Sequence, residues 1–101
     1  MRVVVTAAAK LDLVSIGEHI RPDNPVRADT FVQELLDHCY QLVEMPRRYP
    51  LVPRYEEWGI RRCVHGGYLI FYRVREEEEA IEVIHILHGA MDYESLLFPD
   101  V

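Results

Sequence analysis

The chain has 101 residues, half of them apolar and a tenth aromatic, which predicts one folded domain over residues 1–101 rather than a disordered chain. No apolar run approaches the roughly 20 residues that a membrane-spanning helix needs, and charge appears too early for a signal peptide, so we expect a cytoplasmic protein. Cys39 and Cys63 lie in apolar periodic segments and are expected to be free, buried thiols.

The net charge of −6 is unevenly distributed. Residues 47–75 contain seven arginines against two glutamates, a local charge of +5, and the remainder is strongly acidic. Arginine suits bidentate recognition of carboxylate or phosphate. This segment is interpreted either as a solvated loop and hairpin or as a basic patch that faces an acidic partner.

The first half predicts a strand followed by two helices. The β-branched run from Arg2 to Thr6 favours a strand, and Thr6 can cap a helix that continues to about Ile20. Asn24 is a good N-cap for a second helix from Pro25 to about Met45, just before Pro46. The short link between them predicts an antiparallel helical hairpin.

The second half predicts a loop over residues 46–57 and then a three-stranded antiparallel meander. Its strands are expected at 58–65, 68–75 and 80–88, with a glycine turn at 66–67 and an acidic turn at 76–79. The segment DYESLLF near the end of the chain favours a short helix.

The glycine turn fixes a register in which Cys63 lies opposite Ile70 and Arg61 opposite Tyr72. In the last strand, simple alternation places Ile81, Val83 and Leu87 on one face and Ile84 and Ile86 on the other. Both sheet faces are therefore partly apolar, and a helical hairpin covers only one of them. The terminal helix, a second copy or another protein is needed for the second face.

The stretch HILHGAMDY, residues 85–93, raises the question of a metal or catalytic site. His85 and His88 are three residues apart on a strand and point to opposite faces, which disfavours a shared metal. The other histidines are scattered in the sequence, and neither cysteine pairs closely with one. We expect His85 to be a hydrogen-bonded strand residue and His88 to be exposed, with no metal site and no cofactor.

Four pieces in order carry a family resemblance: KLDLVSIGEHI, NPVRADTFVQELLDHCYQL, IRRCVHGGYLIFYRV and IEVIHILHGAMDYESLL. Over nearly its full length the chain resembles the ParE branch of the RelE/ParE superfamily of type II toxins. The resemblance implies an α+β fold with an N-terminal strand, a helical hairpin, a three-stranded meander and a short C-terminal helix. It also implies an antitoxin partner and a target in DNA topology or translation.

RelE-like toxins cut ribosome-bound messenger RNA, with basic residues that hold the scissile phosphate and stabilise the developing charge. The resemblance carries this ribonuclease role onto Arg54, Arg61, Arg62 and Tyr93. However, the loop contains no lysine, and Met91 stands where the ending LHGARD would place an arginine.

We therefore expect no catalytic residues and a plasmid-stabilisation toxin that inhibits DNA gyrase by protein contact, neutralised by a cognate antitoxin. The alternatives are a RelE-like endoribonuclease and a degenerate, non-toxic binding module. Sequence-specific nucleic-acid binding is not expected, and a homodimer and a toxin–antitoxin heterotetramer both remain open. The residues expected to contact antitoxin or target are Arg48, Arg54, Arg61, Arg62, Tyr72, Arg73, His88, Met91 and Tyr93.

Overall fold

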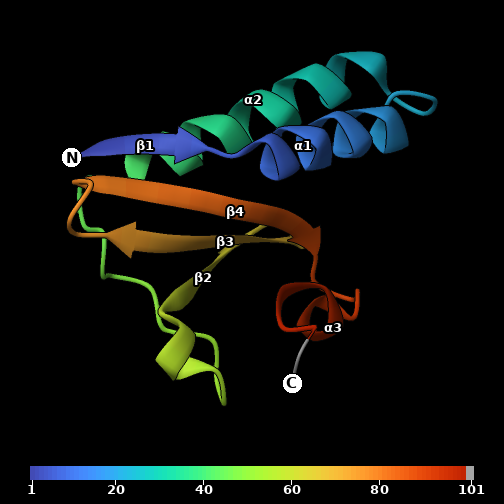
Figure 1. Cartoon of the computed structure of the whole chain (residues 1–101). Helices are drawn as coiled ribbons and strands as arrows, with labels where there is room; N and C mark the ends of the chain where they lie inside the picture. The colour runs from blue at the N-terminus through green and yellow to red at the C-terminus, as the bar shows by residue number, and fades with distance from the viewer. Residues whose placement is uncertain (100–101) are drawn as a thin grey trace.

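The computed structural model describes residues 1–99 and has the expected α+β order (Figure 1). The elements are β1 (Arg2–Val5), α1 (Ala7–Ile20), α2 (Pro25–Gln41), a 3-10 turn (Glu56–Trp58), β2 (Ile60–His65), β3 (Tyr68–Arg75), β4 (Ala80–His88) and α3 (Tyr93–Leu97). The sheet order is β1-β4-β3-β2, with β1 parallel to β4 and the other pairs antiparallel. Within residues 1–99, none of the helices has the length and hydropathy of a membrane span.

Both predicted helix starts are confirmed. The Thr6 side chain accepts a hydrogen bond from the Ala9 amide, and the Asn24 side chain accepts one from the Arg27 amide. The second helix ends four residues earlier than predicted, at Gln41. The Leu42 amide bonds the Cys39 carbonyl, three residues back, so the chain tightens into turns before Pro46 can end the helix.

The predicted hairpin register is confirmed, including the pairs Cys63–Ile70 and Arg61–Tyr72. The preceding strand begins at Ile60 rather than at residue 58, because Trp58 belongs to the 3-10 turn and Gly59 adopts a left-handed φ of 72°.

The predicted faces of the last strand are confirmed as far as Ile84 and were wrong for Ile86 and Leu87. Tyr72 pairs with Val83 and Phe71 with His85, so Ile84 is an extra residue in β4. This β-bulge reverses the alternation. As a result, Ile86 joins the core beneath the helices and Leu87 joins the core on the opposite face.

Each sheet face has its own core. The helical hairpin covers one face, where Ile16 and Leu35 pack in the core with residues of the strands. The other face is covered by α3 and by the segment before β2, which supply Leu97, Phe98 and Val52 (Figure 1). Of the three expected coverings of the second face, the structure shows the terminal helix, aided by this segment.

Candidate functional site

The strand arginine and the terminal tyrosine come together in the structure. The Arg62 guanidinium on β2 donates a hydrogen bond of 2.7 Å to the hydroxyl of Tyr93, the first residue of α3. The Tyr93 ring packs on Phe71, with centroids 5.0 Å apart, which fixes α3 on this sheet face. Of the residues that a ribonuclease would use, these two therefore form a direct pair.

Arg54 lies at the same end of the molecule but is bound to a carboxylate. Its guanidinium is 3.0 Å from Glu94 on α3, and the Tyr55 hydroxyl donates to the same carboxylate at 3.2 Å. The Tyr55 ring stacks on Phe98, with centroids 3.9 Å apart. Glu94 thus offsets the charge of Arg54 next to the Arg62–Tyr93 pair.

Arg61 points to the helix-covered side, away from this pair. Its guanidinium donates at 2.8 Å to the carbonyl of Tyr49, while the Tyr72 hydroxyl donates at 2.8 Å to the carbonyl of Pro46. Tyr72 is fully buried, and this burial raises its pKa to about 12. Tyr72 therefore offers no side-chain surface to a partner, contrary to its predicted contact role; with Arg61 it holds the segment 42–50 in place.

The remaining predicted contact residues are dispersed. Arg73 is 2.8 Å from Glu82 on the neighbouring strand, and Arg48 lies over the Tyr49 ring. His88 is exposed, as expected, and together with the half-exposed Met91 it lines an open groove against α1. His85 is hydrogen-bonded, as expected, with its Nδ1 2.8 Å from the Asp12 carboxylate.

A cluster of four polar side chains was missed by the sequence reasoning. His38 Nδ1 lies 2.8 Å from His65 Nδ1, and His38 Nε2 lies 3.3 Å from both Cys63 Sγ and the Tyr49 hydroxyl. The expectation that neither cysteine pairs closely with a histidine was therefore wrong. The available signal was that His38 sits three residues after Leu35, beside the buried stripe, and that Cys63 and His65 share a strand face.

Burial decides the chemistry of this cluster. Burial is the first cause that raises the pKa of the Cys63 thiol, and it raises the pKa of Cys39 to about 12. Burial, followed by the charges of His65 and Arg48, lowers the pKa of His38. The folded chain therefore favours protonated thiols and a neutral His38, which is the opposite of an activated thiolate–imidazolium pair.

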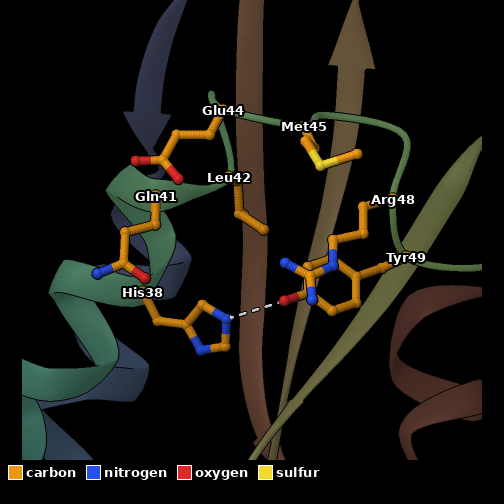
Figure 2. A pocket seen from close by; sticks show the side chains of 7 residues that line it. All are labelled: His38, Gln41, Leu42, Glu44, Met45, Arg48 and Tyr49. Atoms are coloured by element: carbon orange, nitrogen blue, oxygen red, sulfur yellow. Dashed lines mark hydrogen bonds between the residues drawn. The ribbon is translucent and has the colours of Figure 1, made fainter.

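A small cavity of about 80 Å³ lies beside the cluster (Figure 2). Its lining residues are His38, Gln41, Leu42, Glu44, Met45, Arg48 and Tyr49. Figure 2 shows the His38 ring and the Tyr49 hydroxyl converging at its base, from α2 and from the segment 42–50 respectively.

The outer side of the helical hairpin carries a wider groove of about 530 Å³ between α1 and α2. Leu13, Val14 and Val32 contribute apolar surface, and Arg21 and Asp29 pair at the rim at 2.7 Å. Val14 is 56% exposed, so an apolar side chain faces solvent along this groove.

Residues 3–93 match the family described as the ParE toxin of the type II toxin–antitoxin system, parDE. The fold is similar to a chain of the chromosomal ParDE toxin–antitoxin system from P. aeruginosa, with a TM-score of 0.74, 21% identity, and coverage of 87% of this chain and 95% of that one. It is also similar to a chain of the toxin–antitoxin complex RelBE2 from Mycobacterium tuberculosis, with a TM-score of 0.65, 19% identity, and coverage of 86% and 95%. No curated protein matches significantly. Because the family match spans 3–93, the chain belongs to the ParE toxins of type II toxin–antitoxin systems.

Proposed function

We propose that this toxin inhibits DNA gyrase by protein contact and that a cognate antitoxin holds it inactive. Membership of the family supports the toxin role, and two fold neighbours are named as toxin–antitoxin systems, which supports the antitoxin. The gyrase target rests on the chemistry available around Arg62 and Tyr93.

The choice of gyrase as the target rests on the small number of unpaired cations that the described residues provide near Arg62 and Tyr93. Cleavage of a phosphodiester requires fixed cations near the phosphate, and loss of one such donor typically costs on the order of 10²–10³ in rate. Here Arg54 is paired with Glu94 at 3.0 Å, Arg61 is directed at the carbonyl of Tyr49, and residue 91 is methionine. Of residues 1–99, Arg62 is then the one remaining cation at this site to hold a phosphate. Inhibition by protein contact therefore fits these residues better than catalysis.

The antitoxin is proposed to bind the groove between α1 and α2. Val14, 56% exposed on α1, offers apolar surface to an amphipathic helix whose polar side could meet the Arg21–Asp29 rim. The second sheet face is less available to an antitoxin, because α3 and Val52 already cover much of it.

The RelE-like alternative has one observation in its favour, the 2.7 Å hydrogen bond between Arg62 and Tyr93. Such a pair could place a cation and a hydroxyl on one phosphate. Primer extension on ribosome-bound messages, run beside a gyrase supercoiling assay, separates the two functions. We expect inhibited supercoiling and uncut messages; site-specific cuts with normal supercoiling would establish the ribonuclease instead.

The antitoxin site is tested with the product of a short reading frame beside the gene. Val14→Glu should weaken binding at least about tenfold, since it buries a charge in the groove. Val26→Glu is the matched control, because Val26 is 73% exposed and is not among the groove residues. Equal binding by the two variants would place the antitoxin elsewhere.

A further inference from the structure

The segment 42–50 joins α2 to the basic region and is held by three side chains. Tyr72 and Arg61 bind its carbonyls at Pro46 and Tyr49, each at 2.8 Å. His38 holds its one inward-facing hydroxyl, that of Tyr49, at 3.3 Å. Of these three holding groups, only the imidazole has an ordinary pKa near neutrality.

The contact between His38 Nδ1 and His65 Nδ1 requires that one of these two nitrogens carries no proton. At 2.8 Å, one Nδ1 must donate and the other must accept, so one ring presents a lone pair. A single extra proton can still be shared between the rings. When both rings are protonated, two N–H groups face each other across this distance, and like charges repel.

The charged and titratable groups that face the pair come from three parts of the fold. From α2 come Glu34 and Asp37, from the segment 42–50 come Glu44, Arg48 and Tyr49, and from β2 comes Cys63. Glu34 is held at 2.6 Å by Arg27, and Asp37 accepts a hydrogen bond from Gln33. In the described part of the chain, no carboxylate is hydrogen-bonded to either ring.

Open space next to the His38 ring allows the side chain to change its orientation. The two rings also border a second, open hollow, whose other lining residues are Glu34, Asp37 and Gln41. A protonated His38 that turned into this hollow would gain water and two nearby carboxylates. It would leave Tyr49 and Cys63 without their imidazole partner.

We propose that the His38–His65 pair is an acid-sensitive contact: double protonation turns His38 outward and loosens the segment 42–50 from α2 and β2. The segment carries Arg47 and Arg48, so its release changes the presentation of basic residues on the surface. This inference is independent of the target and of the antitoxin site, since it concerns only the state of the chain itself.

The direction of the pH effect follows from His38. Burial first, and then His65 and Arg48, lowers its pKa from the ordinary value of 6.5. The neutral form is therefore the one that the fold holds. Its contribution is complete above pH 6.5 and is lost as the pH falls below 6.5 towards and through the lowered value.

Hydrogen exchange by mass spectrometry, corrected for the intrinsic effect of pH, tests the proposal on the whole chain. Between pH 7.5 and 5.0, protection of the segment 42–50 should fall on the order of tenfold, while β4 stays protected. His65→Gln should keep its protection at pH 5.0, because the opposing charge is gone. His19→Gln, at an exposed histidine on α1, should respond like the wild type.

A proton titration of the histidine rings by nuclear magnetic resonance gives an independent readout. The pKa of His38 should be below 6.5 in the wild type and should rise in His65→Gln. Unchanged protection of the segment in the wild type, or an equal acid loss in His65→Gln, would overturn the proposal. Loss of protection in β4 together with the segment would also overturn it, because that result means global unfolding.

Discussion

Asp12 on α1 completes a hydrogen-bonding edge that β1 leaves open. Strand β1 pairs with β4 only as far as Val83. Beyond that point the Asp12 carboxylate accepts the Ile86 amide at 2.9 Å and lies 2.8 Å from His85 Nδ1. A side chain of the helix thus takes over the role that a strand carbonyl would have.

Asp12→Ala removes the carboxylate oxygen Oδ2, which makes both of these contacts. Ile86 is 1% exposed, so its amide would be left buried without a partner, which costs about 1–3 kcal/mol. The His85 side chain is 21% exposed and can recover part of its loss from water. We expect a total loss of about 2 kcal/mol, or roughly 8–16 °C in melting temperature for a domain of this size.

Urea denaturation at pH 7 measures this loss, with an unchanged slope as evidence of one cooperative transition. Asp12→Asn should lose roughly half as much, since its amide oxygen still serves the Ile86 amide. Glu18→Ala, at an exposed acid on the same helix, should stay within about 0.5 kcal/mol of the wild type. If Asp12→Ala also stayed within that limit, Asp12 would not complete the edge of the sheet.

Leu35 is fully buried between the hairpin and the sheet, so Leu35→Ala should cost about 2–5 kcal/mol by chemical denaturation; a loss well under 1 kcal/mol would contradict the packing of α2. Gly59 has a φ of 72° with free space around its Cβ position, so Gly59→Ala should cost about 1–2 kcal/mol through strain alone, and thermal melting that matches the wild type would refute this conformation. Tyr93→Phe removes the 2.7 Å bond from Arg62 without removing the ring contact with Phe71, so gyrase inhibition should persist; its disappearance would assign the hydroxyl to the target contact.

Local signals in the sequence were sufficient for the elements and the hairpin. The caps at Thr6 and Asn24 and the register set by the glycine turn depend on residues close together in the chain, and all are found in the structure. The helix end at Gln41 was missed because the turns after it satisfy backbone groups without any change in apolar spacing.

The features that escaped prediction depend on distant residues. The bulge at Ile84 arises from the pairing of β4 with β3. The alternation of residues along β4 alone does not predict it. His38 and Cys63 are 25 residues apart, and only the docking of α2 on β2 brings them to 3.3 Å. By contrast, the family resemblance had already assigned Arg62 and Tyr93 to one site, where the structure shows them hydrogen-bonded.

The proposed action of the toxin on gyrase can be measured with a supercoiling assay that contains purified gyrase, relaxed plasmid and the purified chain. Supercoiling should fall with increasing toxin and recover when the antitoxin is added in equimolar amount. Full supercoiling at a large molar excess of folded toxin, whether or not antitoxin is present, would contradict it.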